Sequence, residues 1–153
     1  MPTLPWITPN PAAPGTEAVV MASRFEVRSL ADVPRFLAKS LVVWRQLRTT
    51  PGVVGASLVA RPLKRTFYTL SAWESREALN AFAAAEPHRG VMTGLRRTTR
   101  ESTFTFWRTP VEQLPVTWPE AYRRIDAERT RNQRTQGPQA QGPQTQGPQA
   151  QGS

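Results

Sequence analysis

The hydrophobic period of the chain switches between two residues and 3.6 residues, and this switching most constrains the fold. Residues 17–28, EAVVMASRFEVR, alternate apolar and polar side chains, as a strand with one buried face does. The face that we expect to be buried comprises Val19, Met21, Ser23, Phe25 and Val27. Residues 29–50 repeat apolar side chains at helical spacing until Pro51 and Gly52 end the pattern. A strand followed by an amphipathic helix is therefore predicted.

The same two periods recur in the rest of the chain. Three further segments have the pattern of strands: residues 53–61, 65–73 and 101–108. The short Pro62-Leu63-Lys64 segment is expected to join the first two as a hairpin. A second helix follows them, with Ser75 as its N-cap and Pro87 interrupting its hydrogen-bond ladder. A shorter helix is predicted over residues 88–97.

The order of these elements predicts an α+β fold, the ferredoxin-like βαββαβ arrangement, with a four-stranded antiparallel sheet and both helices on one face. The other face is then left without a cover, although strands two to four carry apolar side chains on both parities. Because a large exposed apolar face favours association, we expect a homodimer whose two sheets close into a dimeric α/β barrel. The Thr-Trp-Pro-Glu capping box at residues 117–120 predicts a C-terminal helix to about residue 131.

Both ends of the chain differ from this central part. Residues 1–16 contain five prolines and are expected to form an extended N-terminal arm rather than an element. Residues 132–153 run into a GPQ(A/T)Q repeat without charges or large apolar side chains, and we expect a disordered tail. The folded domain is therefore predicted to span residues 17–131.

The composition narrows the possible chemistry and location. The chain has no cysteine, which excludes disulfides, thiolate catalysis and cysteine-bound metal. No apolar run approaches the roughly 20 residues of a membrane-spanning helix, and no secretory signal is visible, so a soluble cytoplasmic protein is expected. The formal charge of +9 comes from arginines spread along the chain, which is more typical of solvated surfaces than of a nucleic-acid-binding stripe.

The element order and the stretch LSAWESREALNAFAAAEPH, residues 70–88, resemble the dimeric α/β-barrel superfamily of small antibiotic-biosynthesis-monooxygenase-like proteins. The likeness is specifically to a bacterial branch of uncharacterised members, and it extends over roughly residues 17–125. The superfamily includes cofactor-free oxygenases of aromatic compounds, haem-dependent monooxygenases and proteins with no known reaction. A shared fold does not choose among these activities.

This resemblance implies a pocket between the helices and the sheet, lined by Trp44, Trp73 and His88. In the haem-degrading branch a histidine beyond the second helix ligates iron, and His88 falls near that place. That branch also has a tryptophan where this chain has Phe82. Cofactor-free members use a tryptophan, for which Trp73 is the candidate, and an asparagine that the first strand here lacks. The resemblance thus implies either no cofactor or haem bound through His88.

Several roles stay open for the candidate site residues. His88 can be a haem ligand, a general base, or a helix cap bonded to a carbonyl. Trp44, Trp73 and Trp107 can pack in the core or line a site for a flat aromatic molecule. The predicted catalytic residues are His88 and Trp73, and the predicted pocket residues are Trp44, Phe82, Met92 and Trp107. No metal site is expected.

The predicted function is that of a monooxygenase-like protein that oxidises or binds a hydrophobic aromatic compound in an apolar pocket. The alternative is a non-catalytic small-molecule-binding or pathway-accessory protein. A third possibility, a basic nucleic-acid-binding protein, would show binding that weakens steeply with salt.

Overall fold

A computed structural model describes residues 3–136 of the chain, and its centre is a five-stranded antiparallel sheet with strand order β1-β3-β4-β2-β5. The strands are β1 (Thr3–Ile7), β2 (Glu17–Val27), β3 (Val53–Arg61), β4 (Thr66–Trp73) and β5 (Thr99–Pro110). The helices are α1 (Val33–Arg48), α2 (Arg76–Ala84), α3 (His88–Leu95) and α4 (Trp118–Gln136). Short 3-10 turns lie at Leu30–Asp32, Pro62–Lys64, Arg96–Thr98 and Val111–Gln113. The predicted βαββαβ order and α+β class are confirmed.

The sheet has one strand more than predicted, because part of the expected N-terminal arm forms β1. This strand pairs antiparallel with β3 at the edge of the sheet, where the missing N–H of Pro5 is tolerated. The carbonyl oxygen of Leu4 accepts a hydrogen bond of 2.7 Å from the Ser57 hydroxyl on β3. The indole of Trp6 lies directly on Gly55, where a Cβ atom would come within 2.1 Å of the ring. The Trp6 side chain therefore anchors this segment to the sheet. Its prolines are atypical of a strand, so the sequence did not predict one here.

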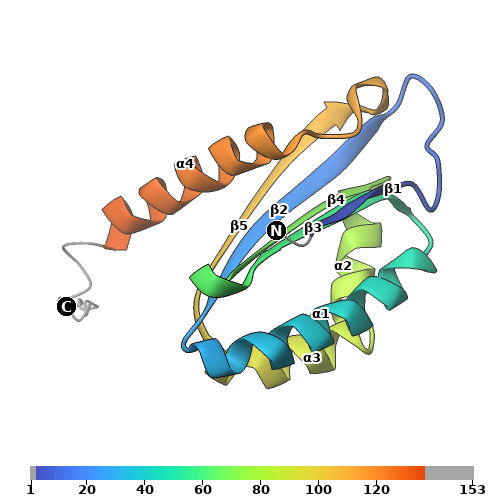
Figure 1. Ribbon diagram of the computed structural model, residues 1–153. Helices are drawn as coiled ribbons and strands as arrows, with labels where there is room; N and C mark the ends of the chain where they lie inside the picture. Colours follow the sequence, from blue (N-terminus) through green and yellow to red (C-terminus); the bar gives the residue numbers. More distant parts are fainter. Residues whose placement is uncertain (1–2, 137–153) are drawn as a thin grey trace, which may run out of the picture.

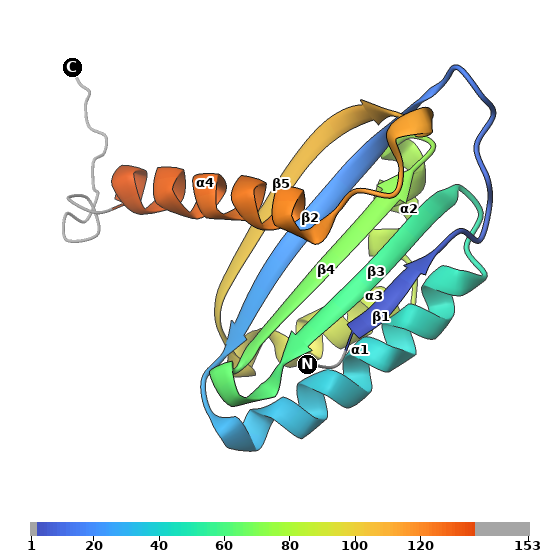
Figure 2. The same cartoon turned by 45° about the horizontal axis from the view of Figure 1, so that its top comes forward.

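Helices α1, α2 and α3 cover one face of the sheet, and α4 lies on the other face (Figure 1). We call these the helical face and the α4 face. Figure 2 shows α4 crossing over β4, β2 and β5. The prediction of an uncovered second face was wrong in this respect. Ala121 and Ile125 of α4 are fully buried there, in a cluster with Ala18, Val20, Ala22, Leu70 and Ala72.

The start of α4 follows the predicted capping pattern. The Thr117 hydroxyl accepts a hydrogen bond of 3.4 Å from the N–H of Glu120. The indole N–H of Trp118 donates to the Ser57 hydroxyl at 3.1 Å, which ties α4 to the middle of β3. The helix continues to Gln136, beyond the predicted end near residue 131. The greater part of the predicted tail, residues 137–153, lies outside the described residues.

On the helical face, aromatic side chains pack between the sheet and α1. The Phe36 ring on α1 lies 4.4 Å from the Phe67 ring and 5.6 Å from the Phe25 ring, between centroids. Toward the other end of the same face, Trp73 is fully buried against Phe82 of α2, with ring centroids 5.2 Å apart. These two aromatic groups hold the helices on the sheet and leave a cavity in the same layer.

Candidate functional site

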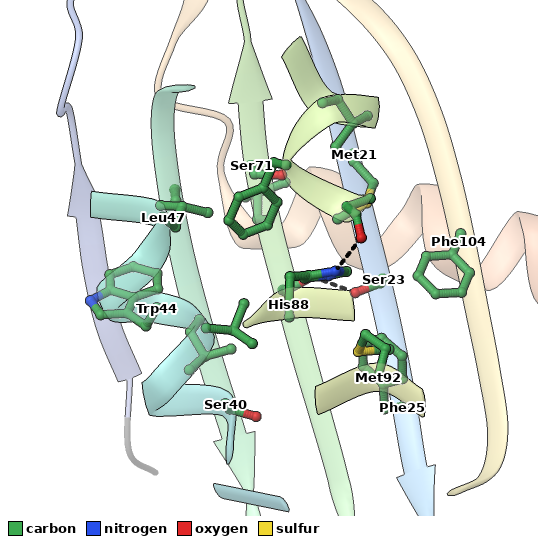
Figure 3. A pocket seen from close by; sticks show the side chains of 18 of the residues that line it. Met21, Ser23, Phe25, Ser40, Trp44, Leu47, Ser71, His88, Met92 and Phe104 are labelled. Atoms are coloured by element: carbon green, nitrogen blue, oxygen red, sulfur yellow. Dashed lines mark hydrogen bonds between the residues drawn. The ribbon is translucent and has the colours of Figure 1, made fainter. Parts of the chain in front are cut away.

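A cavity of about 320 Å³ lies between the helical face of the sheet and helices α1, α2 and α3 (Figure 3). This volume is at the lower end of the range for small-molecule sites. The wall is largely apolar and is formed by residues such as Met21, Phe25, Trp44, Leu47, Phe82 and Met92. An apolar cavity of this size suits a compact hydrophobic molecule.

His88 is the first residue of α3 and lies on the cavity wall. Its backbone N–H donates to the side-chain oxygen of Gln46 on α1 at 2.9 Å, and its ring lies 4.9 Å from the ring of Phe82. Ring atom Nδ1 is 3.1 Å from the carbonyl oxygen of Ala83. Because a carbonyl oxygen only accepts, Nδ1 carries the proton, and Nε2 of the neutral ring is left as an acceptor.

Burial lowers the pKa of His88 below its ordinary value of 6.5, while the hydrogen bond to the Ala83 carbonyl raises it by less. The ring is therefore neutral at pH 7. Its Nε2 atom has no hydrogen-bond partner among residues 3–136. In Figure 3 the ring is directed across the cavity rather than away from it. Such an imidazole can accept a proton or a hydrogen bond from a bound molecule.

The three candidate tryptophans have different environments. Trp73 lines the cavity but is fully buried, and its indole N–H donates to the Ser71 hydroxyl at 2.8 Å. Trp44 is half-buried on the α1 side of the cavity (Figure 3). Trp107 was wrongly predicted to line the pocket. It lies on the α4 face, where the guanidinium of Arg124 is 4.3 Å from its ring centroid. Successive side chains of a strand alternate between faces, so Trp107 points to the other face of the sheet from Phe104 and Phe106. Those two rings line the cavity instead.

The sheet side of the cavity carries a set of hydroxyl groups that was not predicted from the sequence. Ser23 on β2 and Thr69 on β4 are hydrogen-bonded to each other, and Ser71 lies on the same face of β4. A signal for them was present, because Ser23 interrupts the otherwise apolar face Val19, Met21, Phe25 and Val27. A serine in the middle of such a face requires a hydrogen-bond partner.

The open side of the cavity lies beside β5 and the start of α2. Phe104 and Phe106 are each 40% exposed there. The guanidinium of Arg76 lies over the Phe106 ring at 4.2 Å, a cation–π contact. Arg76 is the only arginine or lysine among the described residues of the wall, and Arg89 of α3 is exposed outside it. The mouth is therefore aromatic with a single positive charge.

The residues of the cavity do not fit haem, the cofactor that the resemblance implies as one possibility. Nε2 of His88 is a suitable axial ligand, but the cavity is at the small end of the range even for drug-sized ligands. A tetrapyrrole also carries two propionates, and Arg76 is the single cation on the described wall. No cluster of three or more histidine, aspartate or glutamate side chains that could hold a metal ion occurs in residues 3–136.

The fold is similar to that of antibiotic-biosynthesis-monooxygenase-like proteins of known structure. One crystal structure of an antibiotic biosynthesis monooxygenase matches with a TM-score of 0.54 and 14% identity, over 58% of this chain and 95% of that one. A protein from Nitrosomonas europaea, named as an antibiotic biosynthesis monooxygenase by inference, matches with a TM-score of 0.57 and 12% identity. The match covers 65% of this chain and 94% of that one. A conserved protein from Methanosarcina mazei matches with a TM-score of 0.54 and 11% identity, over 59% of this chain and 90% of that one. At these identities the likeness establishes the fold alone.

The chain belongs to the family described as Domain of unknown function (DUF3291), which it matches over residues 27–142. No curated protein matched the chain. Among the helices of residues 3–136, none has the length and apolar content needed to cross a membrane.

Proposed function

We propose that this protein binds a flat, largely apolar aromatic molecule that carries an ionisable hydroxyl, and oxidises it with dioxygen, with His88 as the base. The observation that carries the proposal is the unpaired Nε2 atom of a neutral imidazole on the wall of an apolar cavity. Its fixed tautomer presents an acceptor to the ligand hydroxyl. The monooxygenase named among the structures of similar fold supports oxidation as the type of reaction.

The proposed reaction needs no cofactor if the substrate supplies the electrons. For a two-ring phenol such as 1-naphthol, His88 accepts the hydroxyl proton, and the electron-rich ring reacts with dioxygen at the carbon opposite the hydroxyl. That carbon loses its hydrogen and gains one oxygen atom as a carbonyl, and the ionised hydroxyl becomes the second carbonyl. The other oxygen atom leaves as water, with protons from the substrate, so that naphthol and dioxygen yield 1,4-naphthoquinone and water. Dioxygen accepts four electrons, all from the ring.

The second candidate function, binding without turnover, is favoured by the environment of Trp73. This residue is fully buried, and its N–H is already bonded to Ser71, so it is not free to bind a substrate. Consumption of dioxygen with an aromatic compound in the cavity distinguishes the two functions.

The test is a calorimetric titration of the protein with 1-naphthol and with naphthalene, which has the same rings but no hydroxyl. We expect the wild type to bind both compounds and to prefer 1-naphthol, because only its hydroxyl can donate to His88. His88→Leu, whose side chain has no hydrogen-bond acceptor, should lose this preference while still binding naphthalene. Arg89→Gln, an exposed neighbour on α3 outside the cavity wall, is the matched control and should behave like the wild type.

Oxygen uptake by the same proteins then tests the chemistry. We expect uptake with 1-naphthol in the wild type and in Arg89→Gln, and a fall of about 10²-fold or more in His88→Leu, as for removal of a general base. Binding without uptake in every protein would reject oxidation of this substrate class and leave the binding function. If neither compound binds, the cavity is not an aromatic site.

A further inference from the structure

Hydrogen-bond donors on the sheet side of the cavity can be assigned by counting hydroxyl protons. Ser23 and Thr69 are register partners on β2 and β4, and their hydroxyls bond to each other. Each hydroxyl has only one proton to donate. In this pair one proton is used for the mutual bond, and the other has no acceptor among residues 3–136.

Burial decides which of the two protons is free. Ser23 is 0% exposed. In the described part of the chain, the Ser23 hydroxyl has Thr69 as its only hydrogen-bond partner. Because a buried donor without an acceptor is costly, the Ser23 proton points to Thr69. Thr69 therefore accepts, and its own proton is left over. Thr69 is half-buried and lines the cavity, so this proton is available to a molecule bound there.

Ser71 adds a second donor two residues further along the same face of β4. Its hydroxyl oxygen accepts the Trp73 N–H at 2.8 Å, and its proton has no acceptor among residues 3–136. The sheet wall thus offers donors, while Nε2 of His88, in the helical layer that faces it, offers an acceptor. One wall of this apolar cavity can donate hydrogen bonds to a ligand, and the wall facing it can accept one.

We propose that Thr69, oriented by Ser23, is a specificity-determining residue that binds an acceptor oxygen of the ligand, a carbonyl or an ionised hydroxyl, against β4. This inference rests on the proposed function, because it requires an aromatic ligand in the same cavity. The ligand class that satisfies both walls is an aromatic compound with two oxygen functions on opposite edges. A hydroxyl faces His88, and a carbonyl faces Thr69.

The test uses a ligand pair that lacks any hydroxyl and so does not depend on His88. The ketone 1-tetralone and the hydrocarbon tetralin have the same two-ring frame and differ in one carbonyl oxygen. We expect calorimetric titration to show that the wild type binds 1-tetralone about tenfold more tightly than tetralin, the effect of one hydrogen bond to a neutral acceptor. Thr69→Val, which keeps the branched shape, should lose most of this preference and bind tetralin as the wild type does.

Arg89→Gln, which lies outside the cavity wall, is the matched control and should keep the preference for 1-tetralone. Ser23→Ala tests the orienting contact and should weaken the preference, because the Thr69 hydroxyl loses its partner. Circular dichroism checks that the variants fold, and Thr69→Ala replaces Thr69→Val if the latter does not. Equal affinity of the wild type for the two compounds, or a preference that survives removal of the Thr69 hydroxyl, overturns the inference but leaves aromatic binding intact. If the wild type binds none of the four ring compounds, the proposed function itself has failed.

Discussion

His88 is the chain's only histidine, and its environment on the cavity wall sets its charge. Burial lowers its pKa below the 6.5 that the imidazole has in an unfolded chain. The Ala83 carbonyl and the Phe82 ring hold the neutral ring in place. The sequence predicted His88 as a candidate but left it open as a ligand, a base or a cap. The Nδ1 contact shows that it does bond to a carbonyl at the end of α2, and the same contact leaves Nε2 available as an acceptor.

The lowered pKa of His88 predicts a pH dependence of stability. In the pH range below 6.5 the unfolded chain binds a proton at His88 before the folded chain does. The free energy of unfolding contributed by this residue is therefore fully present above pH 6.5 and is lost as the pH falls through the folded pKa. We expect the stability of the wild type, measured by urea unfolding, to fall more steeply than that of His88→Gln as the pH is lowered below 6.5. Parallel curves for the two proteins would show that burial does not shift this pKa.

At the scale of elements, α2 and α3 place His88, and their starts are stabilised differently. α2 begins at a side-chain cap, because the Ser75 hydroxyl accepts the N–H of Ala78 at 3.0 Å, as the sequence predicted. α3 begins without such a cap, and the Gln46 side chain of α1 accepts the His88 N–H instead. The first contact connects residues three apart in the sequence and was predictable. The second connects residues 42 apart and was not.

The cap of α2 predicts a measurable contribution to stability. Ser75→Ala removes the acceptor for Ala78 N–H, and we expect the free energy of unfolding to fall by about 1 kcal/mol in chemical denaturation. Ser29→Ala is the matched control, since the Ser29 hydroxyl donates to the Asp32 carboxylate at 3.1 Å and caps no backbone N–H. An equal loss in both variants would contradict a specific role for the cap.

At the scale of the whole molecule, α4 lies on the sheet face through which a dimer was expected to form. The predicted homodimer required two sheets to meet through uncovered faces, but α4 occupies the face concerned (Figures 1 and 2). Trp118 and Ile125 hold the helix there, through the bond to Ser57 and through full burial. We therefore expect a docked α4 to oppose a sheet-to-sheet dimer, because both use this face. The homodimer stays a prediction, and in that geometry it requires α4 to move.

Displacing α4 tests this coupling. Ile125→Asp puts a charge into the buried cluster of the α4 face, and we expect the helix to leave the sheet and the dimer fraction in sedimentation equilibrium to rise. Asp126→Asn, the exposed neighbour on the same helix, should leave the wild-type mass unchanged. A mass that Ile125→Asp does not alter would reject sheet-to-sheet pairing as the route to a dimer.

The sequence by itself determined the βαββαβ order and the helix starts at Ser75 and Trp118. The candidates His88, Trp44, Phe82 and Met92 line the cavity, and their roles in a site stay predictions. Periodicity, caps and turns are properties of residues close together in the chain, so they can be recognised without a structure.

Only the tertiary structure decided the pairing of β1, the side of the sheet that Trp107 faces, the docking of α4 and the free proton of Thr69. Each of these depends on contacts between distant residues. Ser57 meets Leu4 across 53 residues and Trp118 across 61, and Ser23 meets Thr69 across 46. Because β5 carries aromatic side chains on both parities, local alternation did not identify its inner face, and packing against α4 chose it.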